Sequence, residues 1–455
     1  MALFVRISTM LGLNIFIGII LFIMYVVMMS MMIIFERDKP KNMIIWSMVF
    51  LSTQIVGYAI YLVIRHVFYK KRNSIAEKEK EDQIYDHLIA NNIYDNKTCL
   101  DHEVFNFNSL AFDSHITANN SYELFNDYST MKENLIDDLN RAKKYIICEL
   151  TGFNKNDFQD LKEILISKAN DNIAVRLIYD RNIGLNLVKE LRRAGVKVNR
   201  FSKHNTVGRV YSNLRNAITI DGEVVYLTSL NTSKKHLEQK QEVASMFIKI
   251  KGDIVQDIDI QTRKDAVFAS GKFIPYEKQN KPEYRNSVYM QYVANNANTD
   301  LELALIKAIC MAKKSIQLEL AQFIPTESIM SLLRFAINSN IEVRLMVPLK
   351  NDRHGKYFAS RAYAKELALF GANVYLFDGY ITFNAITIDE EYVVFGSFIV
   401  DREHLNTSVQ SMVFIKDNKA VKSFNAMFEA GIANIYRIND AKYMLMREKF
   451  FKNFV

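Results

Sequence analysis

Cysteine is scarce in this chain. Cys99, Cys148 and Cys310 are odd in number and share no metal-ligand spacing. A disulfide scaffold and a zinc site are therefore not expected, and the sequence predicts no other cofactor. Cys148 and Cys310 lie within or beside apolar runs, where a free thiol behaves as a small core side chain in a reducing compartment.

The chain also lacks the interleaved aromatic and basic stripe of single-strand nucleic-acid binders, so no nucleic-acid partner is expected. Its 58 Lys and Arg exceed its 50 Asp and Glu by eight. This surplus favours an anionic partner such as an acidic phospholipid, or is simply a generally basic surface. At 455 residues the chain is too long for one ordinary core, so two or more folded units are expected.

Charge is absent between Met10 and Phe35, a run longer than the roughly 20 apolar residues that cross a bilayer. A second apolar run, Met43–Ile64, ends in the basic segment 65–72. We predict transmembrane helices at about 10–35 and 43–64, with everything downstream in the cytoplasm because positive charge follows the second run. A cleavable signal peptide is the weaker alternative, since the first run is too long and a second follows at once.

The part after about residue 122 repeats itself at a separation of about 170 residues. The matches are AKKYIICEL at 142–150 with AKKSIQLEL at 312–320, NIAVRL at 172–177 with NIEVRL at 340–345, and NAITIDGEVVYLTS at 216–229 with NAITIDEEYVVFGS at 384–397. We predict a membrane anchor over 1–72, a linker and lead-in over 73–121, and two domains over 122–270 and 271–455. The mixed charges of Glu77–Asp82 are typical of a solvated linker.

Within each copy, amphipathic helices alternate with β-branched strands, and a pair of strands joined at Asp-Gly or Asp-Glu follows. The alternation predicts parallel sheets covered by helices on both faces. The expected fold class is α/β, with two transmembrane helices followed by two tandem repeats packed with pseudo-two-fold symmetry. Any cleft would lie where equivalent strand ends meet.

Several segments in this order resemble bacterial cardiolipin synthases of the phospholipase D superfamily. They are VGYAIYLVIRHVFYKKR at 56–72, AQFIP at 321–325 and the paired ITID strands. The resemblance covers about Met43 to the C-terminus and implies tandem phospholipase-D-like α/β repeats. Each half of such a synthase supplies a motif His-x-Lys-(x)4-Asp-(x)6-Gly-Ser/Gly-x-Asn. The motif implies phosphatidyl transfer through a phosphohistidine, with the second His as acid and base, while Lys and Asn bind the phosphoryl oxygens.

The scaffold of that motif is present here, but its chemistry is missing. The His and Lys positions hold Leu214 and Asn216 in the first copy, and Thr382 and Asn384 in the second. The other positions hold Asp221, Thr228, Ser229 and Asn231 in the first copy, and Asp389, Gly396, Ser397 and Ile399 in the second. Losing one positioned charge or donor costs on the order of 3 kcal/mol, so the loss of four such groups predicts a catalytically silent, degenerate member.

The same residue, Asn, occupies both former Lys positions. Either Asn216 and Asn384 form hydrogen bonds across the pseudo-symmetry axis, or they still hold a phosphate headgroup without turning it over. The sequence leaves both interpretations open.

Two functions follow from these residues. The first is a silent relative that binds membrane phospholipid, such as phosphatidylglycerol or cardiolipin, or pairs with an active cardiolipin synthase paralogue at the cell membrane. The second is an active phosphatidyltransferase that makes cardiolipin from phosphatidylglycerol through displaced residues. His236 and His404 are the candidates, because each lies fifteen positions after its motif Asp. Equally, each is a histidine that simply opens a surface helix.

Overall fold

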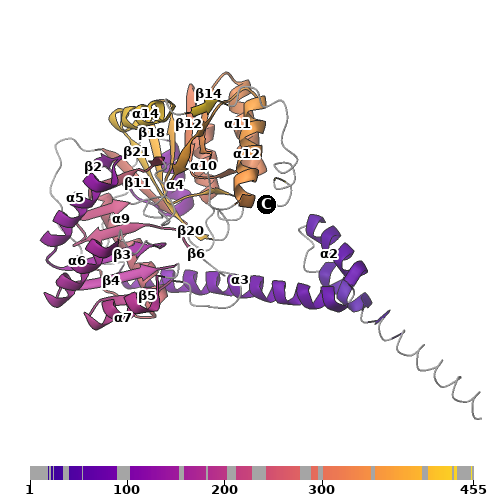
Figure 1. Cartoon of the computed structure of the whole chain (residues 1–455), viewed down its shortest axis with the longest axis horizontal. Coiled ribbons are helices and arrows are strands. Elements are labelled where there is room, and N and C mark those ends of the chain that lie inside the picture. The colour runs from indigo at the N-terminus through magenta and orange to yellow at the C-terminus, as the bar shows by residue number, and fades with distance from the viewer. Residues whose placement is uncertain are drawn as a thin grey trace, which may run out of the picture. The chain divides into compact units, whose positions relative to one another are not determined.

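Figure 1 shows the chain as a computed structural model. It describes residues 19, 22–23, 25–33, 40–53, 55–89, 103–152, 158–180, 183–201, 212–227, 242–276, 288–295, 301–349, 354–401, 408–432, 435–437 and 452. The chain divides into one unit of Met1–Ser74 with Thr206–Val210 and a larger unit of Ile75–Asn205 with Tyr211–Val455. The helix α3, Ile55–Ile89, runs through the boundary between the two units.

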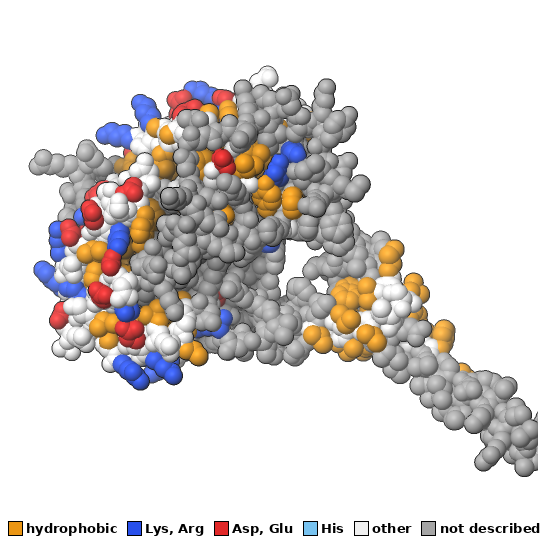
Figure 2. All heavy atoms as spheres, viewed as in Figure 1, with side chains coloured by type: hydrophobic (Ala, Val, Ile, Leu, Met, Phe, Trp, Pro, Cys, Tyr) orange, Lys and Arg blue, Asp and Glu red, His pale blue; other side chains and the backbone are white. Residues whose placement is uncertain are grey.

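The smaller unit packs around an aromatic core. Phe50 on α2 (Pro40–Thr53) and Tyr61 on α3 are almost fully buried, and the ring of Trp46 lies edge-on to that of Tyr61 with centroids 5.1 Å apart. Large apolar side chains point outward from this unit, and Figure 2 shows them gathered over it. Those that are more than 60% exposed are Phe22, Met48, Leu51, Val56 and Val63.

Among the described residues, no helix combines the length and the hydropathy that a membrane crossing requires. The second predicted span, 43–64, is divided between α2 and α3. Most of the first, 10–35, falls in residues whose structure is described only at 19, 22–23 and 25–33. Both spans stay predictions.

The larger unit contains two mixed sheets. The first has the strand order β2-β10-β8-β7-β3-β4-β5. Its strands are β2 (Asn120–Phe125), β3 (Tyr145–Leu150), β4 (Ala174–Tyr179), β5 (Lys197–Arg200), β7 (Ala217–Ile220), β8 (Val224–Leu227) and β10 (Phe247–Gly252). Strands β3, β4 and β5 are parallel, as predicted, whereas the other neighbours are antiparallel. The expectation of parallel sheets is therefore wrong for this part.

The second sheet has the order β1-β11-β21-β18-β17-β12-β14-β15-β22. Its strands are β1 (Ile116–Thr117), β11 (Tyr289–Ala294), β12 (Ser315–Leu320), β14 (Glu342–Pro348), β15 (Asn373–Phe377), β17 (Asn384–Ile388), β18 (Tyr392–Gly396), β21 (Ser411–Lys416) and β22 (Ile435–Arg437). Again only β12, β14 and β15 are parallel to one another, and the other neighbours are antiparallel. The lead-in, 73–121, contributes β1 to this sheet and the first two residues of β2 to the other. The predicted domain boundaries stay a prediction.

Tight turns cause the antiparallel pairing. Asp221 and Gly222 have φ angles of 53° and 69° and turn β7 back into β8. Asp389 and Glu390 do the same between β17 and β18 with φ angles of 51° and 59°. Left-handed backbone at consecutive residues is typical of such hairpins, which explains the Asp-Gly of the first copy.

Helices cover both faces of each sheet, as Figure 1 shows. Helices α5 (Tyr128–Arg141), α6 (Phe158–Asn170) and α7 (Leu185–Arg193) share one core with the first sheet. Helices α4 (Glu103–Phe112), α10 (Leu301–Cys310), α11 (Glu327–Asn338) and α12 (His354–Leu369) share a second core with the other sheet. Helices α9 (Ile254–Ser270) and α14 (Asn418–Ile432) contribute to a third core together with strands of both sheets, so the two halves form one body.

Cys148 and Cys310 differ in their exposure. Cys148 is fully buried on β3, and burial raises the pKa of its thiol to about 12. Cys310 is exposed at the last residue of α10, so the expectation that it is a core side chain is wrong. Its neighbours Ala308 and Ile309 occupy the buried face of that helix turn instead.

Candidate functional site

The two former His positions lie where the halves meet. Two short parallel pairs join the halves there: β6 (Ser212–Asn213) with β20 (Ser408–Val409), and β16 (Gly379–Ile381) with β9 (Glu242–Ala244). The backbone N–H of Leu214 donates to the carbonyl of Val409 at 2.9 Å, and that of Thr382 donates to the carbonyl of Ala244 at 3.0 Å. The backbone of each position is thus hydrogen-bonded to the opposite half.

Neither side chain at these positions provides a histidine-like nucleophile. Leu214 is buried and carries no lone pair. The hydroxyl of Thr382 lies 3.2 Å from the carbonyl oxygen of Ala244, to which it donates, and 3.1 Å from the hydroxyl of Ser245. A carbonyl and a second hydroxyl do not remove a proton from a threonine near neutral pH, so these partners do not activate it.

Asn216 and Asn384 perform the same structural task in the two halves. The side-chain oxygen of Asn216 accepts from the N–H of Thr151 at 2.8 Å, and that of Asn384 accepts from the N–H of Ala321 at 3.0 Å. Thr151 and Ala321 directly follow β3 and β12, so each Asn satisfies an amide at the end of a central strand. In the described part of the chain, neither Asn bonds to the opposite half, contrary to one of the two interpretations.

Asp221 and Asp389 also act in equivalent ways, at the far end of the same strands. The carboxylate of Asp221 accepts from the three backbone N–H groups of residues 143–145 at 2.7–2.8 Å. That of Asp389 accepts from residues 313–315 at 2.6–2.9 Å. Each Asp therefore fixes the Ala-Lys-Lys turn that leads into the central strand, and does not face the former catalytic positions.

The Gly-Ser pair of the second copy has a packing role. A Cβ on Gly396 would lie 2.3 Å from the carbonyl oxygen of Ser411, so only glycine allows β21 to approach. The hydroxyl of Ser397 accepts from the N–H of Ser411 at 3.1 Å. Their counterparts Thr228, Ser229 and Asn231 lie outside the described residues, as do His236 and His404. The displaced-histidine hypothesis stays a prediction.

Sequence reasoning missed two buried glutamates beside these positions. Glu149 and Glu319 are the fifth residues of β3 and β12 and pair with Ala217 and Ala385, which directly follow the two asparagines. Burial raises the pKa of Glu319 to about 8. Burial and the nearby carboxylate of Asp265 raise that of Glu149 well above its usual range. A charged residue inside the otherwise apolar strands YIICEL and SIQLEL was the signal that could have found them.

A buried ion cluster adjoins the first half-site. Arg215 bonds to Asp265, and Lys78 lies 2.8 Å from both Asp265 and Asp82. Lys78, Arg215 and Asp265 are at most 1% exposed. The stretch Glu77–Asp82 lies in the helix α3, but Lys78 and Asp82 are buried, so its interpretation as a solvated linker is wrong at these two residues.

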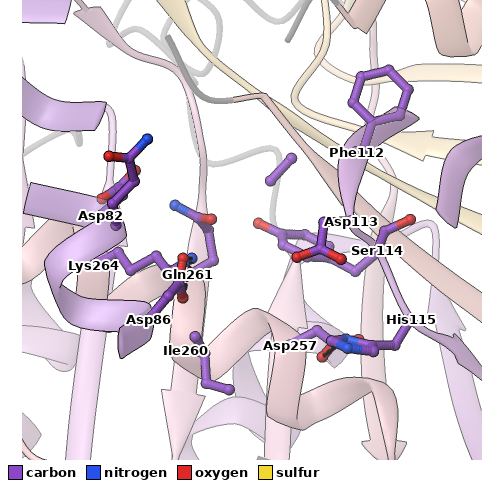
Figure 3. Close-up of a pocket in the computed structure, with 13 residues that line it drawn as sticks. Asp82, Asp86, Phe112, Asp113, Ser114, His115, Asp257, Ile260, Gln261 and Lys264 are labelled. Atoms are coloured by element: carbon purple, nitrogen blue, oxygen red, sulfur yellow. Dashed lines mark hydrogen bonds and ion pairs between the residues drawn. The ribbon is translucent and has the colours of Figure 1, made fainter. Parts of the chain in front are cut away.

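A cavity in the described part of the molecule does not suit a phosphate. It has a volume of about 290 Å³ and is lined by residues of α3, α9 and the segment 112–115, which face each other in Figure 3. Four carboxylates line it: those of Asp82, Asp86, Asp113 and Asp257. Lys264 pairs with Asp86 at 2.6 Å, and His115 with Asp257 at 3.1 Å. A phosphate placed there would meet an excess of like charge.

No group of three or more His, Cys, Asp or Glu side chains suited to a metal ion occurs among the described residues. The contacts that define the half-sites are hydrogen bonds and ion pairs. Two mixed α/β sheets joined at equivalent half-sites define a tandem phospholipase-D-like protein.

Comparison with known proteins gives the family. Residues 135–264 and 305–432 match the family described as "Cardiolipin synthase, PLD-like domain", so the chain belongs to this family. The cardiolipin synthase of Oceanobacillus iheyensis is 26% identical over 436 residues, which cover 90% of this chain and 91% of that protein. The major cardiolipin synthase ClsA of Bacillus subtilis is 27% identical over 443 residues, with the same coverage.

A solved structure supports the fold alone. The phosphatidylserine synthase of Haemophilus influenzae Rd KW20 superposes with a TM-score of 0.59 at 10% identity. The match covers 78% of this chain and 97% of that one. Its extent agrees with two phospholipase-D-like halves in a single body.

Proposed function

We propose that this chain is a catalytically silent member of the cardiolipin synthase family that, at the cell membrane, binds phospholipid without turning it over or pairs with an active synthase. One observation carries the proposal. The four positions where the family motif has His and Lys hold Leu214, Asn216, Thr382 and Asn384, and the two amides support strand ends.

The chemistry of phosphatidyl transfer explains why these replacements matter. The transferred group needs a nucleophile with an available lone pair, and its transition state gains negative charge that positioned cations stabilise. Leucine provides neither, and a threonine bonded to a carbonyl and a hydroxyl is a poor nucleophile. Arg215, which lies between Leu214 and Asn216 in the sequence, is buried and already paired with Asp265.

The location at the membrane is supported by the N-terminal unit. Large apolar side chains face outward from its aromatic centre, which is the reverse of what water favours. Two transmembrane helices at about 10–35 and 43–64, with the tandem domains in the cytoplasm, account for this pattern. The paired strands β6–β20 and β16–β9 support packing of the two halves with pseudo-two-fold symmetry.

A turnover assay tests the silent site. The purified chain in phosphatidylglycerol vesicles with a labelled headgroup is expected to release no glycerol and form no cardiolipin, while the Bacillus subtilis synthase in the same vesicles forms both. Product formation by this chain contradicts the proposal. The double variant His236→Ala, His404→Ala then decides whether the displaced histidines carry the activity.

A pairing assay tests the partnership. The chain and an active family member, each with a different affinity tag, are expected to co-purify from membranes and to cross-link through the tandem domains. An unrelated membrane protein with the same tag is the control. Absence of both signals at comparable expression contradicts the pairing, whereas the silent site is judged by the turnover assay alone.

A further inference from the structure

One lysine of helix α3, Lys78, is buried in the first half. The ammonium of Lys78 lies 2.8 and 2.9 Å from the two carboxylate oxygens of Asp82, one helical turn later, and 2.8 Å from Asp265 of α9. The side chain is 0% exposed. A lysine this deeply buried is rare and is retained only when it is fully paired.

The same aspartate holds the arginine that lies between the two vestigial positions of the first copy. Arg215 bonds to Asp265 and donates to two carbonyls of the second half, that of Asn295 at 2.6 Å and that of Gln410 at 3.2 Å. Asp265 therefore joins α3, the first half-site and the second half through two charged side chains.

The charges of this cluster balance. Lys78 and Arg215 oppose Asp82 and Asp265, and burial and Asp265 raise the pKa of Glu149, which favours its neutral form. Burial alone would raise the pKa of Asp265, but Arg215 and Lys78 hold it below its usual range. Removing one cation would leave an uncompensated buried carboxylate, which is far more costly than removing a neutral pair.

Two further contacts fix the same segment of α3. Lys264 of α9 pairs with Asp86 at 2.6 Å, and the hydroxyl of Tyr85 donates to the carbonyl of Ile274 at 3.0 Å. Residues 78–86 are thus attached to α9 and to the segment after it along more than two helical turns.

We propose that residues 78–86 of α3 form a charge tether, through Lys78, Asp265 and Arg215, that holds the segment 212–216 of the first half-site against the second half. The tether makes the local opening of this half-site depend on α3, whose first residues form the later part of the second predicted membrane span. In the second copy the position of Arg215 is occupied by Phe383, a buried side chain without charge, so the described residues show no equivalent attachment of that half-site. The inference is independent of whether the site binds lipid or turns it over.

Hydrogen exchange of the purified whole chain tests the tether. The double variant Lys78→Met, Asp82→Asn removes the tether but keeps the buried charges balanced, so it is expected to fold. Peptides that cover 212–216 are expected to exchange about tenfold faster in this variant, whereas those that cover 380–384 are unchanged, because local opening has its own free energy.

Matched variants separate the tether from other effects. Lys80→Met, at an exposed position of the same helix, is expected to leave both peptides unchanged. Lys78→Met alone is expected to show the local effect and a lower melting temperature, because it also unbalances the charges. The inference is overturned if the balanced double variant exchanges like the wild type at 212–216, or if both half-sites accelerate equally.

Discussion

The side-chain oxygen of Asn384 accepts a hydrogen bond from the backbone N–H of Ala321 at 3.0 Å, and Asn216 does the same for Thr151 at 2.8 Å. Both asparagines and Thr151 are buried, and Ala321 is half-buried, so each N–H group depends on its asparagine as acceptor. Each asparagine therefore acts as a strand cap in its half. This explains why the same residue occurs at both positions without any need for a shared ligand.

Removal of either cap is expected to destabilise the fold. Asn384→Ala and Asn216→Ala should each lower the free energy of unfolding by about 1–3 kcal/mol, because a buried N–H loses its acceptor. Asn140→Ala, at an exposed position on α5, is the control and should change it little. Denaturant unfolding followed by circular dichroism measures the difference. Equal stability of the Asn384 variant and the control would contradict the cap.

The motif aspartates are expected to matter more than the asparagines. Asp389→Ala removes an acceptor for three backbone N–H groups and places alanine at a φ of 51°, so a loss of about 2–4 kcal/mol is expected. Asp389→Asn should lose less, since one side-chain oxygen remains. Asp137→Ala, on the exposed face of α5, is the control. The same denaturant series measures all three, and an Asp389→Ala variant as stable as the control would refute the clamp.

Particular elements show what the sequence could and could not predict. The repeat predicted the two halves and the strand pairs at Asp221 and Asp389, because local turn chemistry determines them. The alternation of helices and strands did not predict the antiparallel half of each sheet, which depends on partners far along the chain. The mixed charges around Lys78 predict a solvated linker, because its partner Asp265 lies 187 positions away in the sequence. Periodicity contains no information about such a pair.

Glu319 gives a pH dependence with a definite sign. Its pKa is about 8 in the folded chain, above the usual value of 4.5. A raised folded-state pKa stabilises the fold below the unfolded pKa, and this contribution is lost as the pH rises through about 8. The wild type is therefore expected to lose stability between pH 5 and pH 8.5 relative to Glu319→Gln, which stays neutral. Glu327→Gln, at an exposed position of α11, is the control. Parallel unfolding curves for the wild type and Glu319→Gln across this range would contradict the assignment.

Trp46 provides a direct test of the membrane proposal, because it is the only tryptophan in the chain. It lies against Tyr61 in the aromatic core of a unit with large apolar side chains on its outside. In bilayers that contain lipids brominated along the acyl chain, its fluorescence is expected to be strongly quenched, since quenching requires contact or near-contact with the bromine atoms. Acrylamide in the aqueous phase should quench it weakly. Strong quenching by acrylamide and none by the brominated chains would be the reverse pattern. It would mean that the apolar outer surface of this unit faces something other than lipid.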